Sequence, residues 1–420
     1  LQKQARAISA ATVKISSRHN RTERLDNIFL HPVWGVIILA VILTVMFQAV
    51  YAWSGPAMDM IEAGTGAVGH FVGSLLPDGL LKSLIVDGVI AGVGAVIVFL
   101  PQILILFAFI IALEASGYMA RAAFLVDTLM AKVGLSGRAF IPLLSSFACA
   151  IPGIMAARTI ESEKDRLTTI MIAPLMTCSA RLPVYVIIIG AFIPKAKIGV
   201  FNQQGLVMLA LYCAGIVFAL LAALVLKKTV TKGNVPPLLL ELPSYKRPSM
   251  KDFGLGLWQR ARIFMTRAGR IILPASIVVW FLSTFPNNDG KIHDSFAGML
   301  GRFIEPILAP IGFNLEMSIS LIPAMAAREI AVSTLAIVYN AGSADETQAL
   351  GAALVSDWTM PMALAFLAWF VFAPQCISTL AITRKETNSW KWPMFMFSYL
   401  FILAYIAAGL TFWLATWAGL

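Results

Sequence analysis

The chain has 420 residues, of which 59% are hydrophobic and only 13% are charged, and its formal net charge is +10. Soluble domains carry about 25% charged residues, so the composition excludes an ordinary soluble protein. It predicts a polytopic membrane protein surrounded by the lipid bilayer. Ten Lys and Arg residues lie between Lys227 and Arg270, in one segment between apolar stretches. The positive-inside rule explains this distribution without an anionic partner, so we expect no nucleic-acid binding.

The N-terminal part of the chain is predicted to enter and cross the membrane once. Residues 1–32 are basic and polar, which predicts a cytoplasmic lead-in. Val33–Trp53 has no charged residue and is long enough to cross about 30 Å of hydrocarbon. Ser54–Lys82 is acidic and poor in basic residues, which places it outside. Residues 33–83 are therefore predicted to form a first span and an external segment.

Residues 84–226 are predicted to form a first repeat. Its distinctive part is Ala139–Arg166, whose apolar core is short and whose two flanks both carry Lys or Arg. Because cytoplasmic signals lie on both sides, we predict a re-entrant hairpin with its tip near Ala150–Gly153. The other segments are predicted as an inward span, an interfacial helix, a broken outward span and a plain inward span: Leu84–Leu113, Tyr118–Val133, Leu167–Gly190 and Gly205–Leu226.

Residues 263–420 are predicted to repeat this arrangement in the opposite orientation, after a basic cytoplasmic loop over 227–262. LIPAMAAREI (Leu321–Ile330) echoes AIPGIMAARTI (Ala150–Ile160), and Phe370–Ile382 stands where the broken span stood. Inverted repeats with broken helices are a transporter architecture. We therefore predict an all-α polytopic membrane protein, an inverted repeat of broken helices with two re-entrant hairpins. This scheme has seven full spans and an external C-terminus; an even count with an internal C-terminus stays open if one hairpin crosses. The remaining segments are Ile263–Phe285, His293–Ala309 and Phe395–Trp417.

Prolines interrupt the stretch Ala139–Ile188. Pro152 lies in the predicted hairpin, and Pro174 and Pro183 lie in the span that follows. A proline inside a helix leaves the carbonyl four residues earlier without its donor, and at membrane depth such a carbonyl must face protein or a wet cavity. Sulfur and carbonyl oxygen gathered at a broken helix predict a cation site. The freed carbonyls are predicted at Ala148, Ile170 and Ser179.

The predicted metal ligands carry sulfur or oxygen and lie at the breaks or at the inner end of a span. For the methionines, packing is the alternative interpretation; for the serine, a helix–helix hydrogen bond; for the glutamate, a helix end. Cys213 lies in a regular span and is predicted to pack. No cysteines form a close pair, and the four histidines lie outside the predicted spans, which disfavours disulfide, zinc-finger and histidine sites. The predicted ligands are Cys149, Cys178, Cys376, Ser179, Met155, Met176, Met325 and Glu114.

Three arginines lie close to these candidates. Arg158 and Arg328 occupy equivalent places in the echoed motif and are predicted to anchor at the membrane interface. Arg181 lies deeper, where a charge is costly, and an arginine repels a cation. It is therefore predicted to be a structural clamp on a carboxylate such as Glu114 or Glu329.

The stretch FLPQILILFAFIIALEASGYMARAAFLVDTLM (Phe99–Met130), followed by GLSGRAFIPLLSSFACAIPGIMAARTIE and PLMTCSARLPVY, resembles the membrane domain of the ferrous iron transport protein B family. APQCISTLAITRKETNSWKW (Ala373–Trp392) resembles the second gate motif of that family. The resemblance implies two gate repeats and Fe²⁺ uptake across the bacterial inner membrane, with the three motif cysteines in the pathway. It also implies an N-terminal GTPase domain and small cytoplasmic Feo partners, and it leaves a homo-oligomer open.

The chain itself is expected to lack that GTPase domain. It opens on Leu1 and contains no G-x-x-x-x-G-K-[ST] motif, so residues 1–32 are expected to follow a missing N-terminal domain. We expect a transporter rather than an enzyme, with no catalytic residue and no resident cofactor. Fe²⁺ is the transported substrate.

Ligand chemistry permits this function without selecting it. Thiols, thioethers and freed carbonyls suit transition metals better than Mg²⁺, but the affinity order places Fe²⁺ below Zn²⁺. A transporter for another divalent metal therefore stays open. A nucleoside-type carrier with paired hairpins is the second alternative, and a carboxylate-rich midplane pocket would favour it. A membrane enzyme is disfavoured, because no nucleophile–base pair is apparent.

Overall fold

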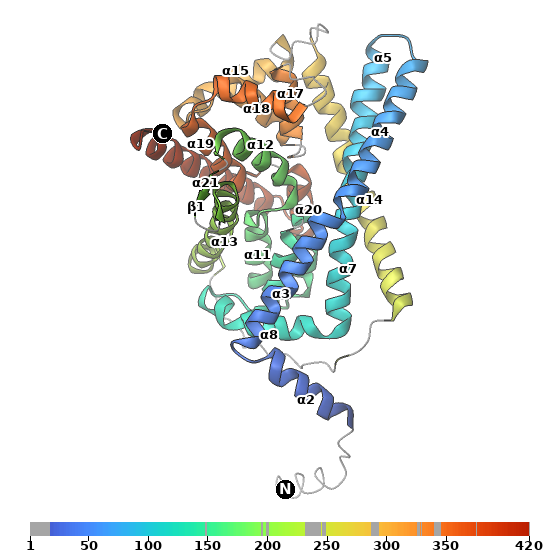
Figure 1. Cartoon of the computed structure of the whole chain (residues 1–420), viewed down its shortest axis with the longest axis vertical. Coiled ribbons are helices and arrows are strands. Elements are labelled where there is room, and N and C mark those ends of the chain that lie inside the picture. Colours follow the sequence, from blue (N-terminus) through green and yellow to red (C-terminus); the bar gives the residue numbers. More distant parts are fainter. Residues whose placement is uncertain are drawn as a thin grey trace, which may run out of the picture.

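The structure is a computed structural model that describes residues 17–147, 149–194, 196–198, 201–231, 245, 249–286, 294–325, 328, 330–339, 346–374 and 376–419. Within these residues it is an assembly of helices with one two-stranded ribbon (Figure 1). The all-α polytopic fold class predicted from composition is confirmed.

The chain enters through a lead-in helix and then forms a longer helical run than the sequence predicts. Ser54–Leu75 is not a loop, because the helical run continues from Trp34 to Leu75 with one turn residue, Ser54. Gly69 of this run packs on Val86 of the returning run. The first span and its external segment are therefore one continuous rod. Its helices are α2 (Ser17–Phe29), α3 (Trp34–Gln48), η1 (Ala49–Trp53) and α4 (Gly55–Leu75).

The chain returns and then turns sideways at a glycine. Gly117 follows the returning run with φ 82°, a left-handed conformation that ends a helix readily only at glycine. The next helix, α8 (Tyr118–Lys132), lies across the lower end of the molecule in Figure 1, as an interfacial helix would. The returning run consists of α5 (Leu80–Ser83), η2 (Leu84–Ile90), α6 (Ala91–Val98) and α7 (Leu100–Ser116).

A buried arginine ties the lead-in helix to α8. Arg121, fully buried, donates from Nε and Nη2 to the carboxylate of Asp26 at 2.7 and 3.2 Å. Tyr245 donates its hydroxyl to the same carboxylate at 3.0 Å, and its ring lies 4.0 Å from the guanidinium. Three segments far apart in the sequence are therefore joined at one point at the inner end of the molecule.

The first predicted hairpin is present, with its turn slightly earlier than predicted. Helices α9 (Phe140–Ser146) and α10 (Ala150–Ala156) pack against each other, and Phe147 and Cys149 lie between them. Arg138 and Glu161, before and after the hairpin, form an ion pair at 2.5 Å. Because this pair joins the residues that precede and follow the hairpin, which we call its feet, both ends of the hairpin lie on the same side of the molecule. Short 3₁₀ turns flank it: η3 (Gly137–Ala139) and η4 (Ala157–Thr159).

A broken helix follows the first hairpin. Helix α11 (Glu163–Ile172) and helix α12 (Leu182–Phe192) are separated by two 3₁₀ turns and a stretch without regular secondary structure at Thr177 and Cys178. A long regular helix, α13 (Gln203–Thr229), then returns beside them. The connecting elements are η5 (Ala173–Leu175), η6 (Ser179–Arg181) and the antiparallel strands β1 (Lys197–Ile198) and β2 (Phe201–Asn202).

The second half forms its hairpin at the opposite end of the molecule. Asn314 and Tyr339, at the two feet, both donate to the carboxylate of Asp357, at 2.9 and 2.5 Å. In Figure 1 the neighbouring α15 and α18 lie at the upper end, away from α8. The hairpins therefore enter from opposite sides, as an inverted repeat requires. The helices are α14 (Met250–Thr284), α15 (Phe296–Leu308), η8 (Ala309–Ile311), α16 (Leu315–Ala324), α17 (Ile330–Val338), α18 (Glu346–Asp357), α19 (Met360–Phe372), α20 (Ile377–Thr387) and α21 (Lys391–Trp417).

Most prolines of the breaks begin a helix instead of interrupting one. Pro183 lies in the first turn of α12, and Pro152 lies near the start of α10. The missing N–H costs nothing in a first turn, because no carbonyl precedes it within the helix. The prediction of freed carbonyls is therefore wrong at Ser179, while Ala148 is outside the described residues. Pro323 does lie inside a helix, α16.

Four helical stretches of the described part are long and apolar enough to cross a membrane, or six if each of two bent pairs counts as one span. This is fewer than the seven predicted spans. The predicted span Leu167–Gly190 is broken between α11 and α12, and the predicted span Ile263–Phe285 lies in the long helix α14, whose apolar part is Ile272–Thr284. The side of the C-terminus stays a prediction. The four stretches are Leu80–Ser116, Gln203–Thr229, Met360–Thr387 and Lys391–Trp417.

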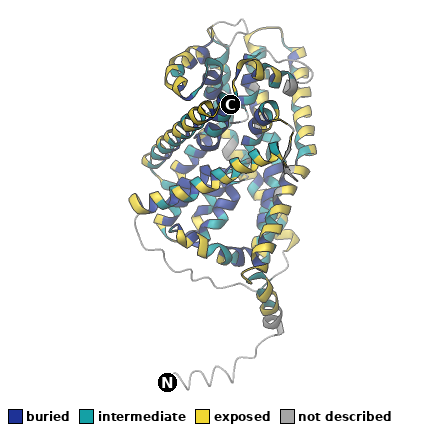
Figure 2. Ribbon diagram, turned by 60° about the vertical axis from the view of Figure 1, so that its left-hand side comes forward, coloured by how far each residue is buried: buried dark blue, intermediate teal, exposed yellow. Residues whose placement is uncertain are grey.

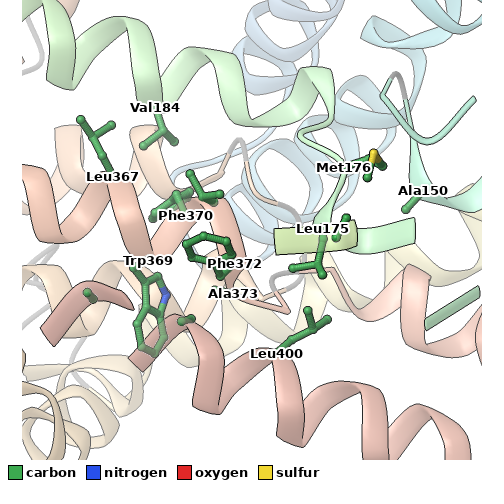
Figure 3. Close-up of a cluster of buried hydrophobic side chains, with 14 of the residues drawn as sticks. Ala150, Leu175, Met176, Val184, Leu367, Trp369, Phe370, Phe372, Ala373 and Leu400 are labelled. Atoms are coloured by element: carbon green, nitrogen blue, oxygen red, sulfur yellow. The ribbon is translucent and has the colours of Figure 1, made fainter. Parts of the chain in front are cut away.

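The largest buried cluster joins the two halves. Buried residues occupy the middle of the molecule and exposed ones its periphery (Figure 2). Figure 3 shows residues of this cluster from both broken helices, including Leu175, Val184 and Phe370, with Leu400 of α21 beside them. Burial of apolar side chains between the halves therefore positions the two helix breaks next to each other.

The hairpin geometry predicts a labelling pattern. Cysteines introduced as Arg138→Cys and Ser162→Cys should both react with an impermeant thiol reagent from the cytoplasm only. Asn314→Cys, at a foot of the other hairpin, should react only from outside. The unsubstituted chain gives the background from exposed Cys213. Reaction of the first two positions from opposite faces would contradict the re-entrant hairpin.

Candidate functional site: three cysteines at the helix breaks

Each candidate cysteine lies at a break in a helix. Cys149 precedes α10 and Cys376 precedes α20, both with extended backbone (φ −156° and −164°). Cys178 lies in the stretch without regular secondary structure between η5 and η6. Neither Cys149 nor Cys376 caps its helix through its side chain. Each of these two cysteines therefore sits at the positive end of a short helix dipole, and all three are free and only partly exposed.

The three cysteines come together from both repeats. Cys149 lies within electrostatic range of Cys178, Cys376 and Arg328. Helix α10 of the first hairpin packs directly against α20 and η5. The backbone N–H of Ile377 donates to the carbonyl of Met325 at 3.0 Å. We call this meeting place of the two helix breaks and the two hairpins the seam.

Arg328 is the charged centre of the seam. It is 6% exposed, and its Nη1 lies 3.5 Å from Sγ of Cys178, to which it donates. Its Nη2 donates to the carbonyl of Ala373 at 3.4 Å. The prediction that Arg328 anchors at the interface is therefore wrong. The echoed motif lies at different places in the two hairpins, because it begins with α10 in the first, whereas it begins within α16 and ends at the first residue of α17 in the second.

Arg158, its predicted equivalent, lies at a foot of the first hairpin. Its guanidinium makes two hydrogen bonds of 2.5 Å to the carboxylate of Glu386 on α20, and its side chain is 53% exposed. The hydrogen bond and charge of Glu386 raise the pKa of the Arg158 guanidinium above its usual value. The pair joins the first hairpin to the broken helix of the second repeat. Glu386 was not among the predicted residues.

Arg181 is a structural clamp, as predicted, but not on a predicted carboxylate. It is fully buried, and its Nη2 donates to the carbonyl of Pro174 at 2.9 Å. The bond closes the loop that carries Cys178. Glu329 lies outside the described residues. Glu114 is 66% exposed near the end of α7 and faces Arg260 at 3.8 Å, so it lies apart from the seam.

Two of the methionine candidates, Met176 and Met155, belong to the apolar packing. Met176 is 4% exposed and lies next to Leu175 and Ala150 in Figure 3. Met155 packs against the same cluster. Met325 faces α20 through its backbone carbonyl. The side chain of Ser179 is outside the described residues, so its predicted role stays a prediction.

The seam borders a small cavity with room for about one water molecule. Pro174 and Pro374 from the two breaks line it, together with Arg328 and Cys376. Among the described residues, no three His, Cys, Asp or Glu side chains are grouped closely enough to hold a metal ion. The thiols are therefore neighbours in this conformation without forming a closed metal centre.

Comparison with known proteins places this arrangement in a family. The family model Gate, described as "Nucleoside recognition", matches residues 96–192 and 265–390. The model "Ferrous iron transport protein B C terminus" matches residues 208–260. Both halves of the seam lie within the Gate match. No solved structure matches the chain significantly.

Similar curated proteins are longer than this chain. The "Fe(2+) transporter FeoB" of Leptospira interrogans (strain Fiocruz L1-130) is 47% identical over 412 residues, which cover 93% of this chain and 59% of the relative. That of Staphylococcus aureus (strain COL) is 41% identical, with 92% and 58% covered. A "Fe(2+) transport protein A/Fe(2+) transporter FeoB fusion protein" of Porphyromonas gingivalis is 40% identical, with 93% and 51% covered. The chain therefore belongs to the Gate family and corresponds to the C-terminal membrane portion of its ferrous iron transport protein B members.

Proposed function

We propose that this chain forms the Fe²⁺ pathway of a bacterial inner-membrane uptake system and that the ion passes through the seam. The observation that carries the proposal is the meeting of Cys149, Cys178 and Cys376 from two inverted repeats. Thiols favour transition metals over Mg²⁺ and Ca²⁺. The names of the relatives, all Fe²⁺ transporters, select iron among the transition metals.

We propose that a domain outside the described helices regulates transport. The chain spans about three fifths of the length of its relatives. We infer that an N-terminal GTPase domain precedes the lead-in helix and acts on the seam through α2 and α8. The fused relative supports a small Feo protein as a partner, because its printed name joins the two.

Nucleoside transport is the competing function, because the Gate model is described as "Nucleoside recognition". A nucleoside offers hydroxyls and ring nitrogens, which need polar side chains such as carboxylates around a pocket. None of the described residues lining the seam cavity is Asp or Glu. The chemistry of the seam therefore favours the metal.

Uptake into vesicles tests the proposal. The purified chain is reconstituted into liposomes, and uptake of Fe²⁺ is compared with that of Mn²⁺, Zn²⁺ and uridine. We expect saturable Fe²⁺ uptake that uridine in excess leaves unchanged. The same chain carrying Cys149→Ser, Cys178→Ser and Cys376→Ser together serves as the control for leak. Uridine uptake without Fe²⁺ uptake would contradict the proposed function and support nucleoside transport instead.

A crosslinking prediction follows from the seam. Hg²⁺ should link Cys178 to Cys376 within one chain, and Fe²⁺ should protect against this linking. We expect Hg²⁺ to succeed more readily than direct oxidation, because a disulfide requires Cα atoms within about 7 Å while a metal bridges a wider gap. Mass spectrometry of the digested protein identifies the linked peptides. Linking to exposed Cys213 instead would contradict the arrangement.

A further inference from the structure

Arg181 carries more hydrogen-bonding capacity than the protein uses. Its guanidinium is fully buried, and only Nη2 has an acceptor, the carbonyl of Pro174. Among the residues that the structure describes, Nε and Nη1 have none. A buried charge without partners is costly, so these two donors point to a ligand.

Two further buried hydroxyls belong to the same region. Oγ1 of Thr177 and the hydroxyl of Tyr185 are fully buried and have no partner among the described residues. Tyr185 follows Arg181 by one helical turn, so the two side chains share a face at the start of α12. All three residues thus offer N–H or O–H donors within nine positions of the chain.

Helix α13 closes this region from the other side. A Cβ built on Gly215 would lie 2.8 Å from Oγ1 of Thr177 and 2.9 Å from the carbonyl of Leu175. Tyr212, on the same face of α13, lies within electrostatic range of both Arg181 and Tyr185. Thr177 therefore packs against α13 beside Cys178, and Arg181 and Tyr185 lie at the start of α12, which contacts α13.

Among the described groups that interact with Arg181, no carboxylate balances its positive charge. The described groups that interact electrostatically with Arg181 are Arg328, Tyr185, Cys178 and Tyr212. None is a carboxylate, and one is a second buried cation. A buried cation is normally stabilised by a paired anion. Among the described residues, no carboxylate is therefore a main partner of Arg181, and an anion that accepts several hydrogen bonds would supply the opposite charge.

We propose that Arg181, Thr177 and Tyr185 bind a small monovalent anion of the chloride class between the start of α12 and α13. A single-atom anion accepts hydrogen bonds from any direction, which suits donors that come from three side chains. Where the proposed function holds, this anion offsets the positive charge of Arg181 beside the Fe²⁺ path. The site itself does not depend on what is transported.

Thermal unfolding of the purified chain in chloride or gluconate at constant ionic strength tests the site. A ligand that binds the folded state raises the melting temperature with its concentration. We expect a saturable rise with chloride and bromide and none with gluconate, which is too large to enter. Arg181→Gln should lose this response. Arg302→Gln, which removes a half-exposed arginine of α15, should keep it. Equal melting temperatures of the unsubstituted chain in both salts would overturn the proposal.

If Arg181→Gln fails to fold, a more conservative variant and a crystallographic experiment still test the site. Tyr185→Phe keeps the guanidinium and should raise the chloride concentration at half-effect about tenfold or more, since it removes one hydrogen bond to a charged group. Bromide should give an anomalous scattering peak beside Arg181. An unchanged chloride midpoint in Tyr185→Phe, or a bromide peak only elsewhere, would refute the site. Because these readouts measure no transport, they are independent of Fe²⁺ uptake.

Discussion

Replacing Cys178 by serine is expected to lower Fe²⁺ uptake at least about tenfold. Cys178 lies in the loop closed by Arg181, and its sulfur accepts a hydrogen bond from Arg328 at 3.5 Å. Serine keeps the size and the hydrogen bond but replaces a soft sulfur by a neutral hydroxyl, a poorer ligand for a transition metal. Initial rates of Fe²⁺ uptake into liposomes measure the effect.

Cys213→Ser provides the matched control. Cys213 lies on the regular helix α13 and is exposed, so the same substitution there should leave uptake within about twofold. Both variants are compared at equal protein content and with equal melting temperatures. Equal uptake by the two variants would remove Cys178 from the pathway.

Gly153→Ala is expected to destabilise the protein by about 3 kcal/mol, at the upper end of overpacking effects. A Cβ on Gly153 would collide with Oγ of Ser146 and lie 2.7 Å from the backbone carbonyl of Pro142. Ser146 already uses its hydroxyl to bond that carbonyl at 2.8 Å. The side chain cannot move away without losing this bond, and the backbone cannot yield without separating α9 from α10.

The measurement is the free energy of unfolding in detergent, with Gly190→Ala as the matched control. Gly190 lies on α12, and a Cβ there meets no atom within 4 Å. Alanine favours a helix over glycine by up to about 1 kcal/mol, so the control should be neutral or slightly stabilised. A Gly153→Ala variant as stable as the control would show that the two arms of the hairpin are not in close contact.

The sequence predicts the architecture better than the details of the seam. Charge on both flanks of Ala139–Arg166 is enough to identify a hairpin, because position relative to the membrane depends on charge. The effect of Pro152 is misjudged, since a proline disrupts a helix interior but fits its first turn. Which of these applies depends on where the helix begins, and the break before α10 leaves no clear signal in the sequence.

The arginines show a second limit. Arg158 and Arg328 stand in nearly identical motifs, yet one is half exposed at a foot and the other is buried beside Cys178. A short sequence motif does not determine where along a hairpin its residues lie. Glu386 was missed because its partner, Arg158, is 228 positions away. Its signal was weak: an acidic residue directly after Arg384 and Lys385.

The three thiols of the seam are carried by different structural segments, and this has a thermodynamic consequence. The two ends of each hairpin are held together, by the Arg138–Glu161 ion pair in one and by hydrogen bonds to Asp357 in the other. The three thiols belong to the first hairpin and to the two broken helices. Any rotation of one segment against another changes the distances between the thiols, and with them the affinity for the ion. Binding strength is then a property of each conformation. Under the proposed function, a change in conformation can release the ion with no need for a competing ligand.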